Sequence, residues 1–195
     1  MAELLKKAPS VETKESTFDD FSKLLGEIGH YMNPDIPLSD ERKKFLIKVT
    51  TATNSIRKYL GDSDKVKCIC VGCGSEPLVA YFIASTTKFE VIAVDPLLSP
   101  HWVEAPKLPN LTCVRSDIDA YIPKETPMFE TCAILWLSSR PNLDKFKSKC
   151  LNHKRIIIMS SPCNGFYHHW IPTPAPFIEY DKLNMLIWDS QLVVQ

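Results

Sequence analysis

Apolar positions in the first third of the chain recur with helical spacing. Between Phe18 and Met32 they fall three or four residues apart, and acidic residues occupy the first turn, where the helix dipole favours negative charge. This pattern predicts an amphipathic helix that ends before Pro34. A second helix is predicted from a Ser39 cap to Gly61, because the apolar spacing continues and glycine commonly ends a helix.

Further along the chain, short apolar runs predict strands. Their residues are apolar at consecutive positions, as in parallel strands that are covered on both faces. The runs are Val66 to Val71, Val91 to Val94, Leu111 to Val114, Thr131 to Leu137 and Arg155 to Met159. The segments Leu78 to Ser85 and Leu143 to Leu151 predict helical connections between strands, and prolines mark 96–109 as a loop.

The end of the chain has a different pattern. Three prolines between His168 and Phe177 predict an irregular or extended excursion, because proline cannot donate a backbone hydrogen bond. Beyond it, Leu183 to Trp188 and Gln191 to Val194 are separated by a two-residue turn. These two segments predict a closing hairpin.

Length and charge indicate one intracellular α/β domain. The 195 residues suffice for one such domain but not for two, so we expect a disordered tail over 1–15 and a single domain over 16–195. The 23 basic and 23 acidic residues cancel, so no global field attracts nucleic acid or an anionic membrane. The charged start lacks a signal-peptide core, and no stretch approaches the ~20 apolar residues of a membrane span. We therefore expect a soluble protein of the cytoplasm or nucleus, without a membrane partner.

The junction between the first two predicted strands carries the most informative motif. Gly72 and Gly74 follow the first strand, a helix comes next, and the second strand ends at Asp95. Glycines at such a turn let the backbone approach a ligand, the helix directs N–H groups at it, and the carboxylate can accept from ribose hydroxyls. The motif is typical of a Rossmann-type βαβ unit and predicts a nucleoside ligand. The alternative is that the two glycines only form a tight turn.

This arrangement resembles the class I S-adenosylmethionine-dependent methyltransferase superfamily. The resemblance spans the chain from the first predicted strand to the C-terminus, and it includes an acid after the second and third strands and the final hairpin. It implies an α/β fold with a Rossmann-like, mostly parallel central sheet, helices on both faces, two N-terminal helices and a C-terminal β-hairpin. It also implies S-adenosylmethionine as the cofactor.

The resemblance assigns roles to four residues. Gly72 and Gly74 would lie against the methionine portion of the cofactor, Asp95 would hold its ribose, and Asp117 would meet the adenine amino group. Ser138, which follows the fourth predicted strand, completes the predicted cofactor-binding set. The function implied is that of a methyltransferase-like protein whose acceptor is unassigned.

Two positions depart from the family pattern. Glu76 replaces the third small residue of the glycine turn, where a carboxylate suits the helix N-terminus but would crowd or repel the cofactor's own carboxylate. After the fourth strand, 137–141 reads Leu-Ser-Ser-Arg-Pro, without the acceptor carboxylate of amino-methyltransferases. Enzymatic activity is therefore left open, and no catalytic residue is assigned.

A second resemblance offers a non-catalytic alternative. An Asp-Pro pair with an apolar and hydroxyl tail spans 95–99, and the apolar strand over 155–161 reads RIIIMSS. These segments resemble the sensitivity-to-red-light-reduced-like domain family. That resemblance implies a Rossmann-like regulatory or interaction module that has lost cofactor binding.

Cysteine and histidine provide further candidates. Cys163 follows a proline, as in the nucleophile turn of cytosine-C5 methyltransferases. However, Cys163 comes after the fifth predicted strand, and the partner segment of those enzymes is missing. We therefore favour an ordinary loop cysteine. His168 and His169 form a possible metal or acid–base cluster. The C-x-C-x-x-C spacing over 68–73 starts inside a strand, where cysteine acts as a small buried hydrophobe, so we expect no metal there.

Basic and aromatic residues add two more hypotheses. A local basic patch could contact the phosphates of RNA, although such runs are more often solvated helix faces. Its members are Lys145, Lys147, Lys149, Lys154 and Arg155. Trp102 and Trp170, in loops on either side of the predicted ligand cleft, are candidates for stacking on a ligand. The methyl acceptor and any protein partner are not identified by the sequence.

Overall fold

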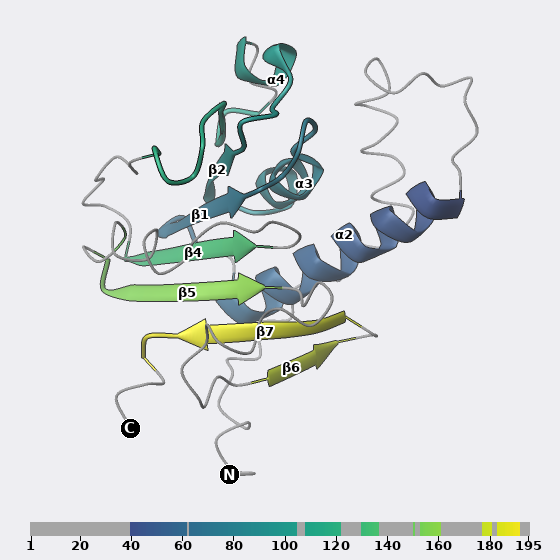
Figure 1. Ribbon diagram of the computed structural model, residues 1–195. Helices are drawn as coiled ribbons and strands as arrows, with labels where there is room; N and C mark the ends of the chain where they lie inside the picture. The colour runs from purple at the N-terminus through teal and green to yellow at the C-terminus, as the bar shows by residue number, and fades with distance from the viewer. Residues whose placement is uncertain are drawn as a thin grey trace.

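The computed structural model describes residues 40–61, 63–104, 108–121, 130–136, 150, 153–160, 177–180 and 183–191. The described residues form one seven-stranded sheet with helices packed against it (Figure 1). The strands are β1 (Val66–Val71), β2 (Glu90–Val94), β3 (Leu111–Val114), β4 (Thr131–Trp136), β5 (Arg155–Ser160), β6 (Phe177–Tyr180) and β7 (Leu183–Asp189). The helices are α2 (Asp40–Leu60), α3 (Leu78–Thr86) and α4 (Pro100–Glu104).

The strand order confirms the predicted Rossmann-like, mostly parallel sheet. The order is β3-β2-β1-β4-β5-β7-β6. β1 pairs in parallel with β2 and β4, while β3 and β5 extend the parallel part on either side. β7 is antiparallel to both β5 and β6. The carboxyl ends of β1 to β5 therefore meet at one edge of the sheet, where ligands of open α/β sheets bind.

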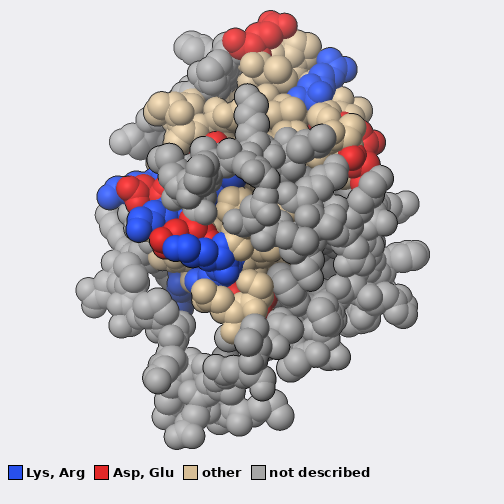
Figure 2. Space-filling model, turned by 90° about the vertical axis from the view of Figure 1, so that its left-hand side faces the viewer, with Lys and Arg blue, Asp and Glu red and all other residues tan. Residues whose placement is uncertain are grey.

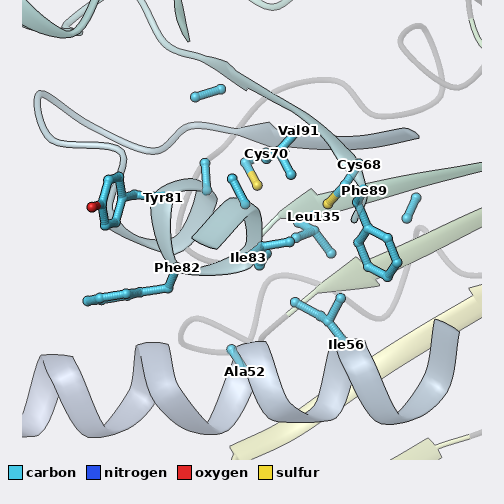
Figure 3. Close-up of a cluster of buried hydrophobic side chains, with 14 of the residues drawn as sticks. Ala52, Ile56, Cys68, Cys70, Tyr81, Phe82, Ile83, Phe89, Val91 and Leu135 are labelled. Atoms are coloured by element: carbon cyan, nitrogen blue, oxygen red, sulfur yellow. The ribbon is translucent and has the colours of Figure 1, made fainter. Parts of the chain in front are cut away.

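One face of the sheet is covered by α2 and α3. Cys68 and Cys70, alternate residues of β1, lie on this face and are buried. Figure 3 shows them in one cluster with Ile56 of α2 and Ile83 of α3. This packing fixes α3 against the sheet, and with it the turn that joins β1 to α3.

The opposite face of the sheet is formed by the strand residues that alternate with those of the first face. Ile69 of β1 and Ile134 of β4 belong to a second buried cluster, and Tyr121 from the segment after β3 packs against it. The helix predicted over Leu143 to Leu151 lies outside the described residues except for Cys150, which is buried in this cluster. Helical cover on this face therefore stays a prediction.

α2 confirms the second predicted helix. Gly61 follows it with φ 73°, and the N–H of Gly61 donates to the carbonyl oxygen of Arg57 at 2.8 Å, which closes the last turn. The first predicted helix, from Phe18 to Met32, and the predicted tail over 1–15 lie outside the described residues. No helix in the part of the chain that the structure describes is long and apolar enough to cross a membrane.

The loop predicted over 96–109 contains a short helix, α4. Pro100 opens this helix, a position where its fixed φ is suitable and its missing N–H costs nothing. The side chain of Trp102 is only 2% exposed and packs in the core beside α3. The prolines therefore mark a helix start, and the prediction of a continuous loop was wrong.

A closing hairpin is formed by β6 and β7, and β7 confirms the predicted strand from Leu183 to Trp188; of the second predicted strand, 191–194, only Gln191 lies within the described residues. β6, which was expected to be irregular, pairs with β7, with Phe177 opposite Leu186 and Tyr180 opposite Leu183. Gln191 lies in a turn, because its N–H donates to Oδ1 of Asp189 at 3.0 Å and bends the chain after β7. The prolines end at position 176, so every residue of β6 retains an N–H for pairing.

Candidate ligand-binding site

The first turn of the sheet requires glycine at two positions. Gly72 and Gly74 have φ values of 66° and 74°, in the left-handed region that side chains disfavour. The N–H of Gly72 donates to the carbonyl oxygen of Val94 at 3.0 Å and so joins the ends of β1 and β2. A Cβ added at Gly74 would meet no atom within 4 Å. The backbone conformation, and not lack of space, therefore selects glycine at position 74, where the turn faces open space.

Asp95, at the end of β2, is hydrogen-bonded to this turn. Its side chain is almost fully buried, with 6% of the residue exposed. Oδ2 accepts the N–H of Gly74 at 2.8 Å, and Oδ1 accepts the N–H of Leu97 at 2.7 Å. A carboxylate oxygen has two acceptor positions, so these two bonds use one position on each oxygen. The structure thus brings together three of the residues predicted from the sequence.

The turn after β2 is fixed by further hydrogen bonds. The N–H of Ser99 donates to the carbonyl oxygen of Ser75 at 3.0 Å, which links this turn to the glycine turn a second time. Nε of Arg115 donates to the carbonyl oxygen of Pro96 at 3.1 Å and links it to the end of β3. Leu97 consequently has a fixed backbone while the residue is 70% exposed. Neither Ser75 nor Arg115 was predicted to belong to the site, although Ser75 follows Gly74 directly and Arg115 lies two residues before Asp117.

Asp117 lies after β3 at the same edge of the sheet. It is exposed, and its Oδ1 accepts the N–H of Asp119 at 2.8 Å. Its carbonyl oxygen accepts the N–H groups of Ala120 and Tyr121, at 3.1 and 2.9 Å. These bonds form a local turn, and no residue in the described part of the chain donates a hydrogen bond to Oδ2 of Asp117. Ser138, the fifth predicted cofactor residue, lies outside the described residues.

The start of α3 has no side-chain cap. Pro77 is the capping residue and makes no side-chain hydrogen bond, and the first turn of α3 contains no acidic residue. Uncapped N–H groups at a helix N-terminus attract anions. Glu76 is half-buried next to this terminus, and its carbonyl oxygen accepts the N–H of Leu78 at 2.9 Å. Glu76 therefore places a carboxylate beside an anion-attracting helix end.

The cysteines around the turn are neutral thiols. Burial raises the pKa of Cys73 far above its ordinary value, and the proximity of Cys70 and Asp95 raises it further. Burial, with a contribution from Cys70, raises the pKa of Cys113 to about 11. Metal ligation and nucleophilic attack both require thiolate. Among the described residues, no group of three His, Cys, Asp or Glu side chains is placed to hold a metal.

Trp102 does not stack on a ligand. Its ring packs edge-on against Tyr81 of α3, with the ring centroids 5.8 Å apart. Its burial comes from α4, which the sequence analysis did not predict. The hypothesis that Trp102 flanks the ligand is therefore wrong. Trp170, Cys163, His168 and His169 lie outside the described residues.

Basic residues of the predicted phosphate-binding patch lie at the opposite edge of the sheet. Nζ of Lys154 is 3.3 Å from Oε1 of Glu130, and Nη2 of Arg155 donates to Oδ2 of Asp189 at 2.5 Å. Figure 2 shows basic and acidic side chains next to each other on this face. The two described members of the patch are therefore each paired with a carboxylate. The other members, Lys145, Lys147 and Lys149, lie outside the described residues.

Comparison with known proteins identifies the fold. No protein-family model matches the chain, and no curated protein matches it by sequence. Among solved structures, a mutant of MtNAS in complex with S-adenosylmethionine matches with a TM-score of 0.56 at 14% identity, over 87% of this chain and 72% of that one. TrmK of M. capricolum with S-adenosylhomocysteine has a TM-score of 0.45 at 16% identity, over 71% and 66% of the two chains. A TehB-like S-adenosylmethionine-dependent methyltransferase from Corynebacterium glutamicum has a TM-score of 0.45 at 12% identity, over 88% and 96%.

The match to the MtNAS mutant concerns the fold. The chain has a Rossmann-like α/β fold, which the structure of that mutant shares. At such low identities the likeness concerns the fold alone, and function has to be argued from the residues at the sheet edge.

Proposed function

We propose that the chain binds S-adenosylmethionine at the carboxyl ends of β1, β2 and β3, and that it is a methyltransferase-like protein of unassigned acceptor. The observation that carries this proposal is the contact between the glycine turn and Asp95, at 2.8 Å from the N–H of Gly74 to Oδ2. The fold shared with the MtNAS mutant, whose structure contains S-adenosylmethionine, supports the choice of ligand.

The residues present fit this cofactor. Gly74 faces open space, so the methionine portion can approach its backbone. The acceptor positions that remain on Asp95 suit two ribose hydroxyls, and Oδ2 of Asp117 suits an adenine amino group. The uncapped N-terminus of α3 would attract the cofactor carboxylate, although Glu76 opposes it by charge repulsion.

The chemistry that the cofactor would supply is a transferable methyl group. The chain's own contribution at this edge would be to bind and orient the cofactor. Burial raises the pKa of Cys73 and of Cys113, which disfavours the thiolate form that a nucleophile needs. Acceptor contacts are expected after β4, around Ser138, outside the described residues. We therefore assign no catalytic residue.

A non-catalytic module is the second candidate, and one observation favours it. Both oxygens of Asp95 already accept backbone N–H groups, from Gly74 and Leu97, so the carboxylate is explained without a ligand. On this account the glycine turn and Asp95 are structural, and the protein acts through a partner that the sequence does not identify.

Calorimetric titration with S-adenosylmethionine and S-adenosylhomocysteine separates the two candidates. Cofactor binding predicts a micromolar Kd, about −8 kcal/mol. Asp95→Asn should abolish this heat, whereas Asp119→Asn, at an exposed position in the turn after β3, should retain it. Absence of binding at millimolar ligand would exclude the first candidate.

A further inference from the structure

We propose that Asp95 is a positioning residue that fastens the turn after β1 to the turn after β2 before any ligand arrives. The inference deepens the proposed function, but only its effect on affinity rests on cofactor binding. The fastening itself is a property of the ligand-free protein.

The two hydrogen bonds of Asp95 differ in the sequence separation between donor and acceptor. Oδ1 accepts from Leu97, two residues ahead, which is the local turn that aspartate commonly makes. Oδ2 accepts from Gly74, which lies 21 residues earlier in a different turn. One carboxylate thus connects the β1–α3 turn to the β2–α4 turn.

Burial makes this connection strong. Asp95 is 6% exposed, so its oxygens have exchanged water for backbone donors. Hydrogen bonds to an ionised acceptor are short and stronger than those between neutral groups, and both of these are below 3 Å. A second tie, from the N–H of Ser99 to the carbonyl oxygen of Ser75, acts between the same two turns. The turns therefore form one unit.

Asp117 provides the contrast within the same chain. Its Oδ1 also accepts an N–H from two residues ahead, that of Asp119. It is exposed, and no described residue from another turn donates to its carboxylate. The same side chain thus makes a purely local turn after β3 and a connection between turns after β2.

The connection has a consequence for any ligand at this edge. A turn that is already fixed loses little conformational entropy when a ligand binds. The smaller entropy loss makes the binding free energy more favourable. Gly74 has the greatest freedom to lose, because glycine has no side chain to restrict its backbone. Asp95 therefore supports binding through the geometry of the glycine turn, in addition to any direct contact with the ligand.

Amide hydrogen exchange in the ligand-free protein tests the inference, with Asp95→Asn compared with Asp117→Asn. The asparagine oxygen can keep the local bond to Leu97, but its amide group donates and cannot accept from Gly74. We expect the Gly74 amide to exchange at least about tenfold faster in Asp95→Asn, the size that a lost bond to a charged group predicts. Asp117→Asn should leave Gly74 unchanged.

Two results would overturn the inference. One is an unchanged Gly74 exchange rate in Asp95→Asn; the other is an equal acceleration at Ile69 in β1, which would indicate general loss of stability. If Asp95→Asn does not fold, amide exchange in the wild-type protein tests the inference instead. The amides of Gly74 and Leu97 should then be as protected from exchange as the amides of the strands. S-adenosylhomocysteine titration adds a separate result: if wild-type protein does not bind it, the proposed function fails while the exchange result stands.

Discussion

The hydroxyl group of Tyr59 donates a hydrogen bond of 2.9 Å to Oδ2 of Asp189, 130 residues further along the chain. The same carboxylate accepts from Nε and Nη2 of Arg155, whose guanidinium carbon lies 5.7 Å from the centre of the Tyr59 ring. The three residues come from α2, β7 and β5. This group therefore attaches the long N-terminal helix to the antiparallel side of the sheet, away from the candidate site.

Removing the carboxylate should destabilise the fold strongly. Asp189 is only 1% exposed, and Asp189→Asn leaves Arg155 without its charged partner, which costs about 3 kcal/mol of unfolding free energy. Tyr59→Phe removes one hydrogen bond to a charged group and should cost about 1.5 kcal/mol. Urea unfolding measures both. Equal stability of Asp189→Asn and wild-type protein would contradict the attachment.

Stability should fall in acid because of the same carboxyl group. Burial raises the pKa of Asp189, but bonds from Arg155, Gln191 and Tyr59 outweigh burial and lower the pKa below its ordinary value of 3.8. A group whose pKa is lowered on folding stabilises the fold above its unfolded pKa and loses this contribution as pH falls through the folded pKa. Unfolding free energy should therefore drop below about pH 4. The drop should be smaller in Asp189→Asn, measured by urea unfolding along a pH series.

Asn110 should be needed where α3 meets β2 and β3. Its Nδ2 donates to the carbonyl oxygens of Ala84, Thr87 and Phe89, at 2.9, 3.3 and 3.0 Å. Asn110→Asp keeps the size of the side chain but places a carboxylate, which cannot donate, opposite three carbonyl acceptors. We expect the unfolding free energy to fall by about 2–3 kcal/mol. Thermal unfolding gives the measurement. A loss no larger than that of an exposed control, Thr112→Ala, would show that these bonds contribute little.

Removing the charge of Glu76 should strengthen cofactor binding. Glu76→Gln keeps the shape of the side chain beside the N-terminus of α3 and removes its repulsion of the cofactor carboxylate. We expect S-adenosylmethionine to bind several-fold more tightly, about 1 kcal/mol for an interaction near the surface. Calorimetry at low and high salt checks the cause, because screening should shrink the difference. Unchanged affinity at low salt would exclude Glu76 as an obstacle.

The thiols beside the glycine turn should react slowly in the folded protein. With a pKa of about 11, Cys113 is only about 0.1% thiolate at pH 8, and the pKa of Cys73 is higher still. Iodoacetamide should therefore modify both far more slowly in buffer than in urea, as peptide mass spectrometry can follow. Rapid modification of Cys73 in the folded protein would show that its thiol is not buried as described.

The strands could be predicted because a buried strand leaves a local run of apolar residues in the sequence. β1 and β3 match the predicted bounds, and β2 and β5 are each one residue longer than predicted, since strands covered on both faces leave uninterrupted apolar runs. Gly72, Gly74 and Asp95 were predictable because the parallel topology brings successive strand ends to one edge. Asp117 was placed there for the same reason.

The remaining features depend on contacts between distant residues. The sequence analysis placed Asp189 in a turn, but Arg155 and Tyr59 hold it at the end of β7, and neither partner is near it in sequence. Trp102 is buried because α4 places it against Tyr81. Likewise, the bond from Gly74 to Asp95 depends on the relative position of two turns. No local pattern encodes these relationships.

Titration of isotope-labelled protein with S-adenosylhomocysteine, followed by amide chemical shifts, tests the central claim most directly. The account predicts saturable shifts at Gly72, Gly74, Leu97 and Asp117, and none at Lys154 on the opposite edge of the sheet. Absence of shifts at millimolar ligand, or shifts confined to the opposite edge, would contradict cofactor binding at the carboxyl ends of β1, β2 and β3.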